Sequence, residues 1–137
     1  MITYNIDMTE DEYVHFEGDT LEELKEFLYP DRFMDCCGYI DDRENCIGIA
    51  LASVKEYGVF LAYHSDGKTN LSLHDRNTLG ELVDVWGDGL YVSAGLFIPP
   101  EIAWQCICEF VTTGSIHYNS IAWISPDDLP EDANYIE

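Results

Sequence analysis

The side chains that could bind a metal or act as nucleophiles are four histidines and five cysteines. The histidines are scattered, and none forms the helical His-x-x-x-His pair that holds a metal from one helix face. His64 and His74 lie on neighbouring predicted strands, where they could face each other or serve as solvent-facing or hydrogen-bonded strand residues. The remaining histidines are His15 and His117.

The cysteines lack the Cys-x-x-Cys spacing of structural zinc sites. Cys106 and Cys108 stand two apart on a predicted helix, point to different faces, and cannot grip one ion together. A nucleophilic cysteine needs positive surroundings to form a thiolate, and the chain carries only 6 Lys and Arg residues. We expect Cys36, Cys37, Cys46, Cys106 and Cys108 to be reduced thiols that pack as small hydrophobic residues. We expect no metal and no cofactor.

Two acidic segments, Asp41–Asn45 and Asp84–Gly89, invite comparison with calcium loops. Neither has the twelve-residue pattern with glycine at position six and a closing glutamate. The glycine spacing of a phosphate-binding loop is also absent. Carboxylate pairs like those of glycosidases occur by chance in so acidic a chain. The chain is therefore predicted not to be an enzyme; the enzyme alternative would require turnover that is lost when a specific His or Cys is mutated.

Charge is the strongest compositional signal. The chain has 137 residues, with 27 Asp and Glu against 6 Lys and Arg, for a net charge of −21. Hydrophobic residues make up 47%, which indicates a folded core rather than a disordered chain. Such a field repels nucleic acid and anionic membranes and attracts cationic protein surfaces. A merely soluble or halophilic protein is the alternative, but the acids here are clustered, which favours a basic partner.

Two segments have the spacing of amphipathic helices. Thr20 opens the first with Glu23 three residues later, as in a capping box, and Pro30 ends it. The second begins at Pro99–Pro100, where the missing amide costs nothing, and ends at Gly114.

Short apolar or alternating runs between turn residues predict the strands. Lys55–Gly58 separates two of them as a β-hairpin, and Asp31–Asn45 is expected to be a loop. We expect one α+β domain over residues 1–137, with an antiparallel or mixed sheet of five to six strands and two helices packed on one face. The acidic tail, residues 125–137, is expected to fray. The predicted strands are Met1–Ile6, Tyr13–Phe16, Cys46–Val54, Gly58–Tyr63, Thr69–His74, Leu90–Phe97 and Tyr118–Ile124.

The first residues, Met1–Asp7, lack a basic region followed by an apolar run, so no secretory signal is expected. Apolar stretches are far shorter than the ~20 residues that span a bilayer. These observations predict a cytoplasmic protein without a membrane segment.

The C-terminal third contains a helix that opens at proline, ends at glycine and leads to a strand finishing on tryptophan. This segment runs from Phe97 to Gly114 and continues at Ser120–Trp123. It resembles the closing motif of the first-numbered immunity-protein family of bacterial polymorphic toxin systems. The acid-rich helix at Thr20–Leu28 and the hairpin through Gly58–Tyr63 fit the same layout.

The resemblance implies an antitoxin that is encoded beside a toxin gene and blocks the toxin by direct binding, with nucleic-acid deaminases as frequent targets. Enzymes that act on DNA or RNA, whether deaminases or nucleases, carry basic clefts for phosphates. An acidic protein can occupy such a cleft and block it stoichiometrically. We expect a monomer that forms a 1:1 heterodimer with a cognate basic toxin and does not contact nucleic acid directly.

Interfaces combine buried aromatic anchors with a charged rim. Loop acids near aromatic residues are therefore the predicted toxin-binding positions, with Trp86 as the anchor. These positions are Asp41, Asp42, Glu44, Asp66, Asp75, Asp84, Trp86 and Asp88. The residues of the family-like motif, Trp104, Phe110, Gly114 and Trp123, are interpreted as structural.

An alternative function is an acidic adaptor, or nucleic-acid mimic, that binds a housekeeping basic protein. Such a gene would have no toxin neighbour, and the interaction would weaken steeply with salt.

Overall fold

The computed structural model describes residues 2–8, 15–29, 33, 36–85, 91–114 and 122–130. Short 3-10 helices, η2 (Arg76–Thr78), η3 (Ala94–Leu96) and η4 (Pro126–Asp128), connect the main elements. The main elements are β1 (Ile2–Met8), β2 (His15–Gly18), α1 (Leu21–Leu28), β3 (Cys36–Asp42), β4 (Ile47–Val54), β5 (Gly58–Ser65), β6 (Lys68–Leu73), β7 (Leu82–Asp84), β8 (Tyr91–Ser93), α2 (Pro100–Thr113) and β9 (Ala122–Ile124).

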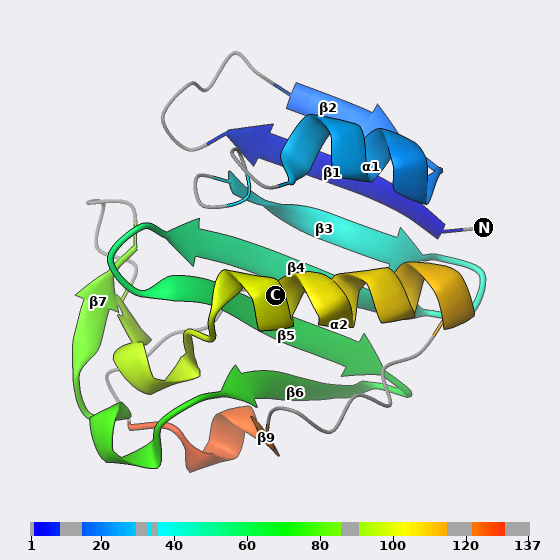
Figure 1. Ribbon diagram of the computed structural model, residues 1–137. Coiled ribbons are helices and arrows are strands. Elements are labelled where there is room, and N and C mark those ends of the chain that lie inside the picture. The colour runs from blue at the N-terminus through cyan, green and yellow to red at the C-terminus, as the bar shows by residue number, and fades with distance from the viewer. Residues whose placement is uncertain are drawn as a thin grey trace.

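The strands form one large antiparallel sheet in the order β2-β1-β3-β4-β5-β6-β9, and β7 and β8 form a separate two-stranded sheet. Both helices lie on one face of the large sheet, with α2 crossing β4 and β5 and α1 beside β1 (Figure 1). The predicted α+β class, with an antiparallel sheet and two helices on one face, is confirmed. The β4–β5 hairpin and the third strand β6 also match their predictions.

Residues Cys36–Asp42 form β3, so the prediction of a loop over Asp31–Asn45 was wrong for this part. Glycine and aspartate are depleted in strands, which hid the element in the sequence. The strand forms because it pairs along its length with β1 on one side and β4 on the other. With this strand, the large sheet has seven strands.

The segment Leu90–Phe97, predicted to be one strand, is divided. Its described part contains the three-residue strand β8 followed by η3, and the backbone of Ile98 forms an isolated bridge to Val59. Of the tail expected to fray, residues 125–130 contain η4, and Leu129 packs against the core. The rest of that tail, residues 131–137, lies outside the described residues.

Local chemistry sets the ends of both helices. The Thr20 side chain accepts a hydrogen bond from the backbone N–H of Glu23 at 3.2 Å, which caps α1 as its spacing predicts. The second helix begins at Pro100, and Gly114 ends it in the left-handed conformation with φ of 80°. These ends agree with the sequence prediction.

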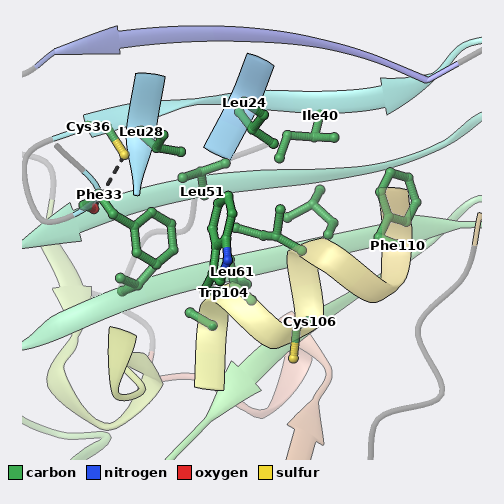
Figure 2. Packing of buried hydrophobic residues seen from close by; sticks show 14 of the residues in the cluster. Leu24, Leu28, Phe33, Cys36, Ile40, Leu51, Leu61, Trp104, Cys106 and Phe110 are labelled. Carbon is green, nitrogen blue, oxygen red and sulfur yellow. Dashed lines mark hydrogen bonds between the residues drawn. The ribbon is translucent and has the colours of Figure 1, made fainter. Parts of the chain in front are cut away.

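The sheet separates two hydrophobic clusters. The helix-side cluster joins α1 and α2 to alternate residues of β1, β3, β4 and β5, among them Ile40, Leu51 and Leu61. Figure 2 shows this side, with Trp104 between Phe33 and Phe110. On the opposite face, the intervening residues of β4 and β5 pack with Val83 of β7 and the following Val85, and with Val92 of β8 and Leu96 of η3. The helices therefore cover one face, and the small sheet covers part of the other.

Candidate binding surface

Most carboxylates in the described part of the chain are exposed. Asp42, with 7% of its surface exposed, is the buried exception there. On α1 the exposed acids are Glu22, Glu23 and Glu26, as the amphipathic spacing predicts. The negative charge of the described residues is therefore carried largely on the surface of the fold, where it can act on a partner.

The structure divides the predicted toxin-binding residues into two groups. Because neighbouring strands are antiparallel, the β3–β4 turn and the β5–β6 turn lie at the same end of the sheet. We call this the turn end; it carries Asp41, Asp42, Glu44 and Asp66, and it lies to the right in Figure 1. Asp75 follows the opposite end of β6, and Asp84 is the last residue of β7, the strand at the left in Figure 1. Trp86 and Asp88 lie outside the described residues.

Asp42 stabilises the β3–β4 turn. Its carboxylate accepts hydrogen bonds from the backbone N–H of Asn45 at 3.4 Å and from the Asn45 side-chain amide at 2.7 Å. The hydrogen bond from the Asn45 side-chain amide is the main reason that the pKa of Asp42 is lowered. Its neighbour Glu44 is exposed, as is Asp66, whose positive φ of 55° places it at the tip of the β5–β6 turn.

Asp41 projects from the other face of β3, away from the helices. The register places it opposite Gly48, and Gly48 opposite His64. A Cβ atom at position 48 would collide with Oδ1 of Asp41, so glycine leaves the space that this carboxylate occupies. Burial raises the pKa of the Asp41 carboxyl group, although Arg43 and His64 act in the opposite direction. Asp41 is thus a partly desolvated carboxylate.

Two cavities adjoin Asp41. One, of about 310 Å³, is lined by Asp41, Asp42, Arg43, Cys46, Ile47, Gly48 and His64. The other, of about 520 Å³, is lined by Thr3, Tyr4, Asn5, Gly18, Asp19, Tyr39, Asp41 and Arg43. We call the two together the Asp41 groove.

The second group of predicted residues lies around the β7–β8 hairpin. Asp84 pairs in register with Tyr91, and both side chains are exposed. Leu82 is also exposed, while the intervening valines point into the core. We call Leu82, Asp84 and Tyr91 the hairpin face. Leu82 is 37% exposed and Tyr91 44%, which places two large apolar side chains beside a carboxylate. By contrast, the half-buried Asp75 caps η2, accepting a hydrogen bond from the N–H of Asn77 at 2.9 Å.

Leu82, Tyr91 and the exposed Tyr39 were not identified from the sequence. The alternation of Leu82, Val83, Asp84 and Val85 was the available signal for the hairpin face, because alternate residues of a strand point to opposite sides.

The residues of the family-like motif lie in or against the helix-side core. Trp104 stacks on Tyr29 at 4.8 Å between ring centroids, and Phe110 is fully buried. Tyr63 of β5 contacts both Phe110 and Trp123, so it links α2 to β9. Gly114 ends the helix.

The reactive side chains are not assembled into a site in the described residues. The five cysteines are free, and burial raises the pKa of the Cys106 thiol to about 11. His64 pairs in register with Thr69, whereas His74 is exposed beyond the end of β6. Within the same residues, no cluster of three or more His, Cys, Asp or Glu side chains is arranged to hold a metal ion.

No helix among the described residues is long and apolar enough to cross a bilayer. Comparison with known proteins gives no matching family model, no matching curated protein and no matching solved structure.

Proposed function

We propose that this chain is an immunity protein: a cytoplasmic antitoxin that binds a basic, nucleic-acid-targeting toxin, such as a deaminase, and blocks its active site in a 1:1 complex. The observation that carries the proposal is the net charge of −21 on a chain that nevertheless builds two hydrophobic clusters. Self-repulsion at this charge opposes folding, and a cationic partner would relieve it.

A toxin that acts on nucleic acid must itself be positively charged around its cleft. Exposed carboxylates on α1, at the turn end and on the hairpin face match the phosphates that such a cleft binds. Charge complementarity also speeds encounter, toward ~10⁸–10⁹ M⁻¹s⁻¹ at low salt. A rapid encounter suits an inhibitor that must capture a lethal enzyme soon after synthesis.

Charge alone gives little specificity, so the interface also needs apolar anchors. The hairpin face supplies them, because Leu82 and Tyr91 are large side chains held outward by a packed strand pair. Asp84 pairs in register with Tyr91 and adds a carboxylate beside these anchors. We assign the hairpin face to the centre of the toxin interface.

Co-expression with the basic toxin encoded beside the gene tests the proposal. We expect growth to be rescued and the two proteins to elute together from a size-exclusion column in equal amounts. A Leu82→Ser/Tyr91→Ser variant should lose rescue, whereas Glu101→Gln, an exposed change at the start of α2, should retain it. Failure of the native chain to rescue growth, with binding to an unrelated basic protein instead, would support the adaptor alternative and refute this function.

A further inference from the structure

The Asp41 groove combines a partly desolvated carboxylate and an exposed aromatic ring with a histidine whose buried ring nitrogen is unsatisfied. Tyr39 and Asp41 are two residues apart on β3, so both side chains point away from the helices. Tyr39 is 41% exposed, and both residues line the larger cavity. The smaller cavity continues from Asp41 over Gly48 to His64.

His64 supplies the unsatisfied polar atom. Its Nδ1 lies 2.8 Å from Oγ1 of Thr69, which fixes the ring. Its Nε2 is buried and has no hydrogen-bond partner among the described residues. A buried polar atom without a partner costs free energy. When Nδ1 donates to Thr69, Nε2 is an acceptor.

The charges around the groove favour a cation. The ionised side chains that line it are the carboxylates of Asp19, Asp41 and Asp42 and the guanidinium of Arg43. Acids therefore outnumber bases at the groove, as they do over the whole chain. Asp42 is already engaged by Asn45, so Asp41 is the carboxylate best placed to receive a ligand.

We propose that the Asp41 groove is a slot for an arginine side chain of the partner protein, with Asp41 as its counter-ion and the Tyr39 ring as its stacking surface. A guanidinium is planar, donates two parallel hydrogen bonds to a carboxylate and stacks on aromatic rings, whereas a lysine ammonium acts as a point charge. The slot rests on the proposed function, because it gives a basic partner one specific contact at the turn end.

The slot can be tested without the partner, by following backbone amide signals of the purified chain in an NMR titration with N-acetyl-arginine amide. We expect saturable shifts at Asp41, Gly48 and His64, and much weaker shifts with N-acetyl-citrulline amide, which has nearly the same shape without the charge. Asp41→Asn should weaken the arginine probe about tenfold, because a hydrogen-bonded ion pair is lost. The matched control Asp66→Asn, an exposed acid at the same end, should change the affinity less than twofold.

A substitution of Arg43 shows whether the groove binds cations or anions. Arg43→Gln removes a competing positive charge and should tighten arginine binding about threefold, which is the Coulomb energy of two charges ~6 Å apart in water. Weaker arginine binding in this variant, or tighter binding of inorganic phosphate than of arginine to the native chain, would overturn the slot. The same spectra show whether each variant is folded.

The arginine slot and the immunity function can be refuted independently of each other. Absence of probe binding with an intact toxin complex refutes the slot alone. Probe binding that depends on Asp41, without any toxin complex, refutes the immunity function but leaves the cation slot in place.

Discussion

Two fully buried serines test which hydrogen bonds stabilise the face of the large sheet opposite the helices. Ser72 of β6 joins three elements: its Oγ donates to the carbonyl of Leu96 in η3 at 2.8 Å and accepts from the N–H of Leu61 in β5 at 3.0 Å. Ser93 of β8 is equally buried, but its Oγ has no hydrogen-bond partner in the described part of the chain.

Ser72→Ala leaves two buried backbone groups unsatisfied, at about 1–3 kcal/mol each, so we expect a loss of about 3 kcal/mol in the free energy of unfolding. With a urea m-value of about 2 kcal/mol/M, the midpoint of unfolding falls by about 1.5 M. Ser93→Ala removes an unsatisfied hydroxyl and should leave stability unchanged or raise it by about 1 kcal/mol.

Urea unfolding followed by tryptophan fluorescence and circular dichroism measures both variants on the same day and in the same buffer. Equal destabilisation by the two substitutions, or a smaller effect of Ser72→Ala, would refute the role given to the Ser72 hydrogen bonds.

Three further predictions concern the interface, the turn end and the core. Tyr91→Ala should weaken toxin binding at least tenfold in a calorimetric titration, because a central aromatic anchor is removed. Glu101→Gln should change the affinity less than twofold. Equal effects would count against the hairpin face as the centre of the interface. Two neighbouring acids should affect the pH dependence of stability in opposite ways. The ionised Asp42 carboxylate, whose pKa is lowered in the fold, stabilises the folded state above its ordinary pKa of 3.8, and this stabilisation is lost as the pH falls. Asp42→Asn should therefore destabilise the fold at neutral pH. Asp41→Asn should instead stabilise at neutral pH and lose that advantage in acid, since the folded pKa of this carboxyl group is raised; thermal melts from pH 3 to 7 measure both, and parallel curves would contradict the assignment. Phe110→Ala should cost about 3–5 kcal/mol in urea unfolding, and a loss below 1 kcal/mol would show that its site is not part of the packed core.

Local signals in the sequence were enough to predict both helices and the β4–β5–β6 meander. Thr20 and Glu23 fix the start of α1, and Pro100 and Gly114 bound α2, because these residues act on backbone groups next to them. The turn at 55–57 sets the hairpin in the same way. Elements of this kind are encoded within a few residues.

The third strand could not be predicted locally, because its pairing with β1 and β4 outweighs the low strand propensity of Gly38, Asp41 and Asp42. The same strand positions the Asp41 groove, so the groove could not be predicted from local sequence either. The sequence pointed to Asp41 as an acid, but its relation to Gly48 and His64 depends on the register of three strands. The residue types can be read from the sequence, but the register between strands that are distant in the chain cannot.

The division of the predicted interface into two groups has the same origin. Acids that are close in sequence are separated by the antiparallel course of the chain. Asp66 and Asp75 are only nine residues apart, but Asp66 precedes β6 and Asp75 follows its other end. The hairpin face gained Leu82 and Tyr91 because β7 and β8 pair and turn their valines inward.

The most direct test of the central claim is the association rate of the purified chain with the basic toxin that the proposed function requires, measured by stopped-flow fluorescence at 50 and 500 mM NaCl. An acidic protein that docks on a cationic cleft should bind at or above ~10⁸ M⁻¹s⁻¹ at the lower salt concentration, and at least tenfold more slowly at the higher one. No complex, or an association rate that does not change with salt, would contradict the account.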